Sequence, residues 1–265
     1  MANDPFASFK AAQREGWALF APLETLTTPP AGALVAFAGV RPGQAVLDVA
    51  CGTGVVAVTA ARAGAQVKAL DLAPALLARA RQNAEVAGVA IEFTEGDVEA
   101  LPYPDASFDV VLSQFGHMFG PRPAVTVAEM LRVLKPGGRI AFNTWPPELF
   151  TGLMFALVSR YVAPPPDVPP TVLWGDPSVV RERLGDAVEA LEFDREIMLT
   201  PCLSPQHYRA TIEGTAAPLL KLVQSLSGEP AKLAQFRAEL EALIARFTKQ
   251  NVLLQHFLQT RAIKR

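Results

Sequence analysis

The sequence predicts an α/β protein built on a doubly wound, mostly parallel sheet of seven strands. Two observations favour this fold. Apolar, strand-like runs alternate with helical patterns of about ten to fifteen residues between Ala45 and Trp145, which is typical of βαβ units. A glycine turn, Gly52 to Gly54, follows the first run, and open α/β sheets bind ligands at such carboxyl ends of their strands.

The chain before the sheet is predicted to be helical. Apolar residues at helical spacing indicate a short helix over 6–20, and a second helix is expected from Pro29 or Pro30 to Phe37. The alternating part then predicts strands over 45–50, 65–71, 90–97, 107–115 and 139–145. Helices are expected between them, from the glycine turn to Ala63, over 74–88 and over 124–134, where "KPGG" ends the last one.

The regular alternation stops after Trp145. The remaining elements are, in order, a helix over 146–162, a proline-rich connection over 163–170, a short helix with Asp176 as its N-cap, a strand over 187–200, two or three helices over 204–250 and a last, antiparallel strand over 251–264. Nothing marks a second domain, so we expect one domain over residues 1–265.

Composition excludes several classes of protein. The 265 residues are 50% hydrophobic and 19% charged, with a formal net charge of -2, so a basic surface for nucleic acid is not expected. The two cysteines, Cys51 and Cys202, form no CxxC pair, and no histidine or acid spacing suggests a metal, which predicts a metal-free protein of the reducing cytoplasm. The longest apolar stretch is interrupted by Arg160 and predicts no integral membrane segment. We expect a monomer or homodimer.

The glycine turn is open to three interpretations. A P-loop needs GxxxxGK[ST], and it is excluded because no lysine follows Gly54 before Lys68. A dinucleotide fingerprint fits Gly52, Gly54 and Ala57, with Asp71 as the acid for the ribose. Asp48 lies just before the turn, where its charge disfavours a pyrophosphate. A nicotinamide-dependent oxidoreductase therefore stays as an alternative.

Four blocks support the third interpretation, an S-adenosylmethionine site. They are "VLDVACGTG", "KALDLAP", "TEGDVEALPYPDASFDVVLSQFGHMF" and "LRVLKPGGRIAFNTW". In order and spacing they resemble the motifs of class I S-adenosylmethionine-dependent methyltransferases, in particular the ubiquinone/menaquinone-biosynthesis-like branch. The resemblance implies a Rossmann-like fold with a helical lid. It also implies a helical cap over 1–40, a cofactor-binding core over 41–145, lid elements over 146–186 and 201–250, and final strands over 187–200 and 251–265.

The resemblance also implies which residues bind S-adenosylmethionine and its product S-adenosylhomocysteine. Asp71 would accept hydrogen bonds from the ribose hydroxyls, Leu72 would lie against the adenine, Asp97 would accept from the adenine amino group and the Val98 amide would meet a ring nitrogen. Ser113 and Gln114 would line the methionine portion. The turn itself would contribute Asp48, Ala50, Cys51, Gly52, Thr53 and Gly54.

The predicted reaction is an in-line methyl transfer to an oxygen, carbon or nitrogen atom of a small, mostly apolar molecule. His117, in the loop after the fourth strand, is the candidate base if the acceptor must lose a proton, although it could equally pack in that loop. For His207 and Tyr208 we expect structural roles. "SQFG" stands where DNA and RNA amino-methylating relatives carry "DPPY" or "NPPY", which argues against a nucleic-acid acceptor. A protein that binds the cofactor without transferring methyl is a further alternative.

Overall fold

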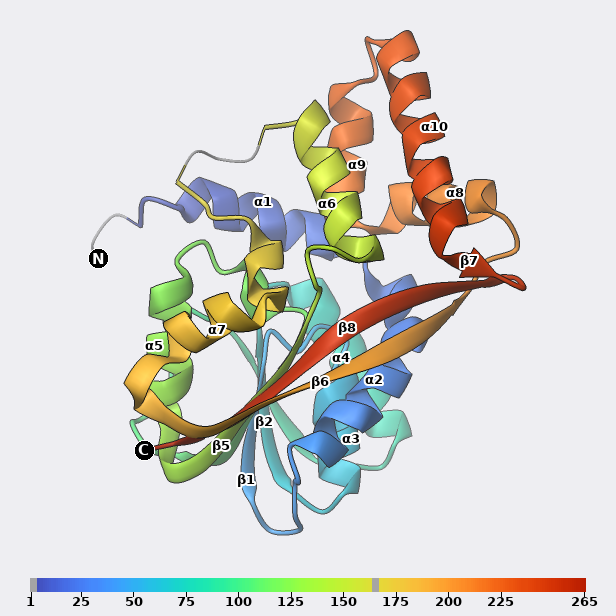
Figure 1. The fold of residues 1–265 in the computed structure, drawn as a ribbon. Coiled ribbons are helices and arrows are strands. Elements are labelled where there is room, and N and C mark those ends of the chain that lie inside the picture. Colours follow the sequence, from blue (N-terminus) through green and yellow to red (C-terminus); the bar gives the residue numbers. More distant parts are fainter. Residues whose placement is uncertain (1–3, 164–166) are drawn as a thin grey trace.

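The computed structural model describes residues 4–163 and 167–265, and its centre is one twisted sheet (Figure 1). The strand order is β3-β2-β1-β4-β5-β8-β6, with the short β7 paired to β8. The strands are β1 (Ala45–Val49), β2 (Gln66–Asp71), β3 (Ile91–Glu95), β4 (Phe108–Gln114), β5 (Leu134–Thr144), β6 (Val188–Pro201), β7 (Thr248–Lys249) and β8 (Val252–Lys264).

Strand directions follow the predicted mostly parallel pattern. The first five strands pair in parallel, whereas β8 is antiparallel to both β5 and β6. The prediction of a doubly wound, mostly parallel sheet with an antiparallel last strand is therefore confirmed. The chain reverses its strand order between β1 and β4, and ligands bind in open α/β sheets at the carboxyl ends of the strands beside such a switch.

Helices cover both faces of the sheet because side chains alternate along each buried strand. Val46 and Val110 face a core formed with α2 (Glu24–Phe37), α3 (Val55–Arg62) and α4 (Pro74–Val86). Leu47 and Val111 face the opposite core, formed with α5 (Pro123–Val133) and α7 (Pro177–Leu184). Figure 1 shows α2 and α3 on one side of the sheet and α5 and α7 on the other.

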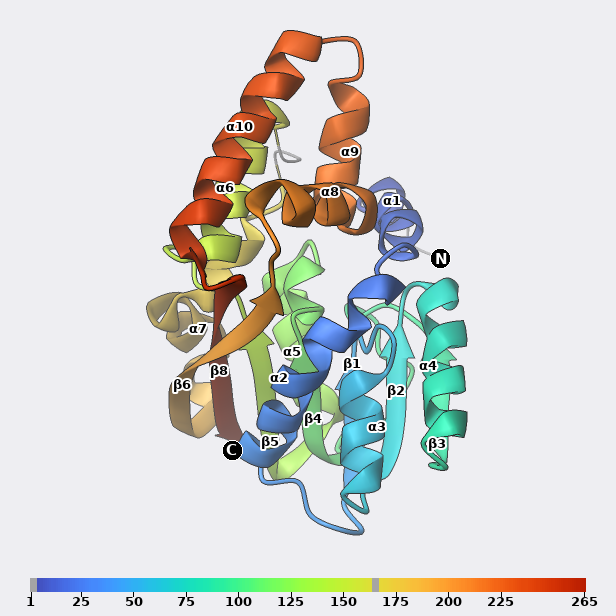
Figure 2. The same ribbon diagram turned by 90° about the vertical axis from the view of Figure 1, so that its right-hand side faces the viewer.

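A helical layer lies over the carboxyl ends of the parallel strands (Figure 2). It contains α6 (Phe150–Tyr161), α8 (Pro205–Thr215), α9 (Ala217–Ser225) and α10 (Pro230–Phe247), which share a third apolar core. The N-terminal helix α1 (Ala7–Trp17) packs beside α9, and a Cβ on Gly16 would lie only 2.8 Å from Ala217 Cβ. We refer to α1 and these four helices as the lid.

Two element boundaries differ from the predictions. Helix α2 begins at Glu24, so Pro29 and Pro30 lie inside it and not at its first turn. The Thr27 and Thr28 hydroxyls donate to the Glu24 carbonyl oxygen in this proline-containing stretch. The "KPGG" segment is part of β5, where an irregularity in the pairing with β4 accommodates the extra residues.

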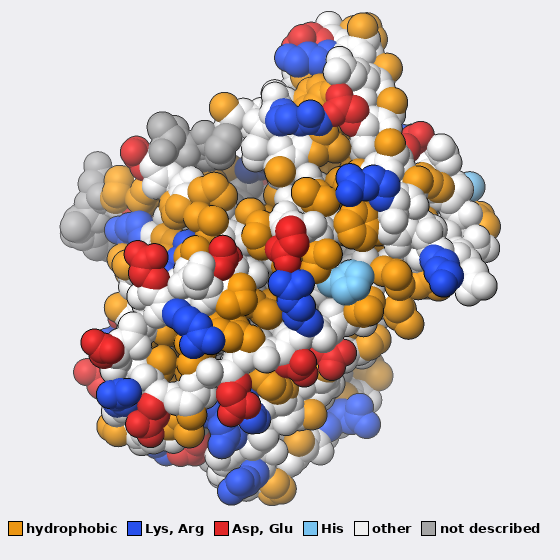
Figure 3. Space-filling model, viewed as in Figure 1, with side chains coloured by type: hydrophobic (Ala, Val, Ile, Leu, Met, Phe, Trp, Pro, Cys, Tyr) orange, Lys and Arg blue, Asp and Glu red, His pale blue; other side chains and the backbone are white. Residues whose placement is uncertain are grey.

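The remaining boundaries agree closely with the sequence patterns. Asp176 is the N-cap of α7, and its carboxylate accepts the Ser178 N–H. Residues 164–166 of the predicted proline-rich connection over 163–170 lie outside the described residues. In the part of the chain that is described, none of the helices combines the length and the apolarity needed to cross a membrane. The face in Figure 3 carries acidic and basic side chains interspersed with apolar ones.

Candidate functional site

A cavity of about 230 Å³ lies between the carboxyl ends of the parallel strands and the lid. One end is lined by the glycine turn after β1, the end of β2 and the segment after β3. The other end is lined mainly by apolar side chains of the lid, together with residues of β6 and β8. We call these the cofactor end and the acceptor end. They belong to one continuous cavity, which extends from Asp97 to Gln255.

The glycine turn has the backbone conformation that its sequence requires. Gly52 and Gly54 have φ values of +55° and +79°, a region that costs glycine little because it lacks a Cβ. Gly54 is the N-cap of α3, and a Cβ there would lie 3.0 Å from Ala80 Cβ. Gly54 therefore supports the close packing of α3 on α4. Ala50, Cys51, Gly52 and Thr53 line the cavity.

Asp71 joins the end of β2 to the glycine turn. One carboxylate oxygen accepts the Gly52 N–H at 2.7 Å, and the other accepts the Ala73 N–H at 2.8 Å, where α4 begins. Burial raises the pKa of this carboxyl group above its ordinary value, against the effect of those backbone bonds. Asp71 and Leu72 both line the cavity, so the predicted ribose and adenine contacts are compatible with the structure.

Asp48 presents a buried oxygen without a partner. Its Oδ2 accepts the Ala57 N–H at 3.0 Å, whereas Oδ1 has no hydrogen-bond partner among the described residues. The side chain is 1% exposed and lines the cavity. Burial, reinforced by the negative charge of Asp71, raises its pKa well above the ordinary value of 3.8. An unpartnered carboxylate oxygen of this kind fits a cationic hydrogen-bond donor.

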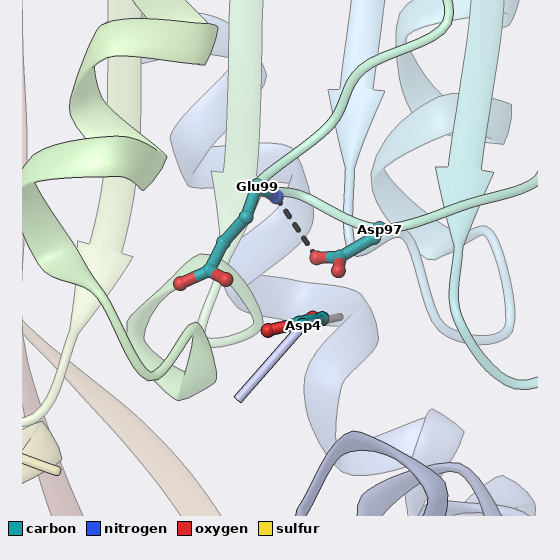
Figure 4. A group of neighbouring side chains, drawn as sticks. All are labelled: Asp4, Asp97 and Glu99. Carbon is teal, nitrogen blue, oxygen red and sulfur yellow. Dashed lines mark hydrogen bonds between the residues drawn. The ribbon is translucent and has the colours of Figure 1, made fainter. Parts of the chain in front are cut away.

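Asp97 belongs to an ion-pair cluster with Asp4 and Glu99, in which Asp97 and Glu99 come from the loop after β3 and Asp4 comes from the N-terminal segment (Figure 4). Lys10 Nζ of α1 lies 2.6 Å from Asp97, 2.6 Å from Glu99 and 2.7 Å from Asp4. Hydrogen bonds to these acids raise the pKa of Lys10, although burial acts in the opposite direction. Arg122 also pairs with Glu99. Because Lys10 and Arg122 already pair with these carboxylates, we assign no metal ion to the group.

The structure does not place His117 where the base prediction needs it. The imidazole is fully buried, lies 4.6 Å from the Phe142 ring and 4.7 Å from the Trp174 ring, and does not line the cavity. Neither ring nitrogen has a partner among the described residues, and burial lowers the pKa of His117 to about 3. A histidine that stays neutral inside an aromatic cluster serves packing, so we do not carry the base role forward.

The other predicted residues divide into cavity-lining and supporting positions. Val98 and Gln114 line the cavity, and Gln114 Nε2 donates to the Thr27 carbonyl of α2. Ser113 does not line it. Its hydroxyl donates to the Val49 carbonyl at 2.7 Å and accepts the His117 N–H, so it fixes the ends of β1 and β4 from behind the cavity.

The sequence analysis gave Tyr208 only a structural role, and it did not single out the other polar residues of the acceptor end or the cation at the cofactor end. Thr151, Tyr208 and Gln255 line the acceptor end from α6, α8 and β8. Their separation along the chain leaves no spacing pattern to detect. Phe115 and Trp145, which stack with ring centroids 3.8 Å apart, also line the cavity. Lys10 was missed because two of its partners, Asp97 and Glu99, lie almost ninety residues further along the chain.

Comparison with known proteins agrees with this architecture. Residues 47–142 match the Methyltransferase domain family. An uncharacterised protein of Mycobacterium tuberculosis is 33% identical over 260 residues, which cover 96% of this chain and 95% of the relative. Demethylmenaquinone methyltransferase of Deinococcus radiodurans is 44% identical over 124 residues, which cover 45% of this chain and 51% of that enzyme.

Solved structures share the fold at low sequence identity. The YcgJ protein of Bacillus subtilis has a TM-score of 0.61 at 19% identity and covers 89% of this chain and 97% of its own. Phosphoethanolamine N-methyltransferase 2 of Haemonchus contortus, solved with S-adenosylhomocysteine, has a TM-score of 0.55 at 17% identity, covering 89% and 52%. The chain therefore belongs to one family with the uncharacterised mycobacterial protein, and its residues 47–142 are similar to the Methyltransferase domain family.

Proposed function

We propose that this chain binds S-adenosylmethionine at the cofactor end of the cavity and transfers its methyl group to a small, mostly apolar molecule at the acceptor end. The acceptor atom is an oxygen, carbon or nitrogen, and S-adenosylhomocysteine is the product. The observation that carries this proposal is the unpartnered Asp48 oxygen at the edge of a cavity whose far end is apolar. The ammonium group of the cofactor's methionine portion is a cation that would pair with that oxygen.

The remaining cofactor contacts follow from the carboxyl ends of the strands. Asp71 would accept from the ribose hydroxyls while it holds the Gly52 N–H, and Leu72 would lie against the adenine. Asp97 and the Val98 amide would form hydrogen bonds with the edge of the adenine, and Lys10 lies beside Asp97. Cys51, Gly52 and Thr53 would border the bound molecule, whereas Gly54 and Ser113 would support the turn from outside the cavity.

The chain contributes to the reaction by alignment and by exclusion of water. When bound, the cofactor supplies an electrophilic sulfonium methyl group. Apolar lid side chains such as Met154, Phe155 and Ile212 would hold the acceptor in line with that methyl and keep water out. No residue is assigned as a base, because His117 lies outside the cavity.

Calorimetry tests the cofactor assignment directly. S-adenosylhomocysteine is expected to bind, and NAD is expected to bind weakly or not at all, because the carboxylate of Asp48 lies just before the glycine turn, where a pyrophosphate would carry its negative charge. Asp71→Ala removes the ribose contact and releases the glycine turn, so binding of S-adenosylhomocysteine should weaken at least about tenfold. The control is Asp186→Ala, at an exposed position outside the cavity. Tight NAD binding without S-adenosylhomocysteine binding would overturn the proposal.

A further inference from the structure

The acceptor end contains a small polar group inside an otherwise apolar wall. Thr151, Tyr208 and Gln255 line the cavity there and are only 6%, 9% and 5% exposed. Around them lie apolar lining residues of the lid and of β6, among them Met154, Met198 and Ile212. A buried polar side chain costs free energy unless its hydrogen-bonding atoms are satisfied, so the partners of these three can be counted.

Both amide hydrogens of Gln255 are used within the protein. Its Nε2 donates to Thr200 Oγ1 at 2.6 Å and to Tyr208 Oη at 3.2 Å, and its Oε1 accepts from Thr151 Oγ1 at 3.3 Å. An amide nitrogen has two hydrogens, and both are accounted for. Gln255 therefore fixes Tyr208 Oη in place as a hydrogen-bond acceptor.

The phenol hydrogen of Tyr208 has no acceptor among the described residues. A phenol is both an acceptor and a single donor, and Oη receives its bond from Gln255. Within the described residues, Tyr208 Oη donates no hydrogen bond. Burial also raises the pKa of Tyr208, so its hydroxyl keeps the hydrogen throughout the physiological range. Tyr208 thus lines the apolar end of the cavity and holds a phenol hydrogen that no described residue accepts.

We propose that Tyr208 is a specificity-determining residue, whose hydroxyl donates a hydrogen bond to an oxygen atom of the methyl acceptor. The ligand class is an apolar molecule that carries a carbonyl, ether or hydroxyl oxygen. Gln255 is a positioning residue that acts through Tyr208. That the ligand is the methyl acceptor rests on the proposed function. The preference for a ligand with an oxygen atom does not require the cofactor.

The test compares two bicyclic probes that differ by one oxygen, the ketone 1-tetralone and the hydrocarbon tetralin. Ligand-observed NMR titrations give a Kd for each probe, with and without S-adenosylhomocysteine. Tyr208→Phe removes only the hydroxyl, so the ratio of the tetralone Kd to the tetralin Kd should rise about 3- to 10-fold over wild type. The matched control is Tyr161→Phe, whose hydroxyl bonds Glu239 outside the cavity and whose ratio should stay unchanged.

A ratio that changes by less than twofold in Tyr208→Phe overturns the inference, as would be seen if a water molecule took the phenol hydrogen. Absence of binding of both probes to the wild-type protein also overturns it. Gln255→Met provides a second variant should Tyr208→Phe fold poorly, and its ratio should rise in the same direction. A protein that shows the preference but fails to bind S-adenosylhomocysteine would refute the proposed methyl transfer and leave this donor assignment standing.

Discussion

Replacing Asp48 by asparagine tests the central electrostatic element of the site. The substitution keeps the size of the side chain and leaves one oxygen to accept the Ala57 N–H. It replaces the carboxylate, whose Oδ1 has no partner among the described residues, by a neutral amide group. A hydrogen bond between oppositely charged groups contributes about 1.5–3 kcal/mol, so Asp48→Asn should weaken S-adenosylhomocysteine binding about 10- to 150-fold.

A second ligand separates this effect from damage to the cavity. 5′-Methylthioadenosine keeps the adenosine and sulfur but lacks the amino acid portion, so its affinity should change less than about threefold. Calorimetric titrations of both ligands provide the measurement. Equal losses for the two ligands, or unchanged S-adenosylhomocysteine affinity in the variant, would refute the assignment of Asp48 to the ammonium group.

The pH dependence provides an independent check. The folded protein holds the Asp48 proton more tightly than the unfolded chain does, because burial raises the pKa above 3.8. The free energy of unfolding of wild type therefore loses this contribution as pH rises from about 4 through the raised pKa, and Asp48→Asn escapes that loss. The variant should gain stability relative to wild type as pH rises. Wild-type affinity for S-adenosylhomocysteine should increase over the same range, with proton release, and the variant's should not.

Three further variants test the surroundings of the site. Lys10→Met leaves Asp97 and Glu99 without their shared cation and should lower the free energy of unfolding by about 3–5 kcal/mol. The control Lys135→Met breaks a more exposed ion pair and should cost about 0–1 kcal/mol. Equal losses for the two variants in denaturant titrations would contradict a stabilising role for the Lys10 cluster. The free energy of unfolding of wild type should fall as the pH drops from 6.5 to 3, because the unfolded chain binds a proton at His117 before the folded protein does. In His117→Phe the free energy of unfolding should depend less on pH over this range. An unchanged pH dependence would show that another group titrates. Gly116→Ala would place a Cβ 2.5 Å from Ala50 Cβ, so it should lower the free energy of unfolding by about 1–3 kcal/mol and weaken S-adenosylhomocysteine binding. The control is Gly214→Ala in α8, where a new Cβ would meet no atom of the described residues within 4 Å beyond the helix's own backbone. It should be neutral or stabilising in thermal melts.

The cofactor end could be predicted from sequence because its determinants are local. The glycine turn, Asp48 and Asp71 lie at the ends of strands that short-range patterns reveal, and parallel strands bring their carboxyl ends together. The acceptor end could not, since Tyr208 and Gln255 meet only through tertiary packing of α8 against the sheet.

Side-chain direction was the other limit. His117 follows β4 as predicted, but the sequence of a loop does not tell which residue faces the cavity, and the aromatic rings of Phe142 and Trp174 surround this one. Similarly, the prolines at positions 29 and 30 suggested a helix start, whereas the helix begins at Glu24, whose carboxylate accepts hydrogen bonds from Arg79 and Asn83 of α4.

The position of β8 makes the sheet depend on a segment far along the chain. Because β8 lies between β5 and the edge strand β6, a nascent chain that has not yet supplied residues 252–264 leaves β5 unpaired on one side and β6 without its partner strand. Unpaired strand edges recruit other chains, and pairings between distant segments form slowly. Polypeptides truncated before Val252 should therefore aggregate. During synthesis, chaperones should matter most before residues 252–264 are available to pair with β5 and β6.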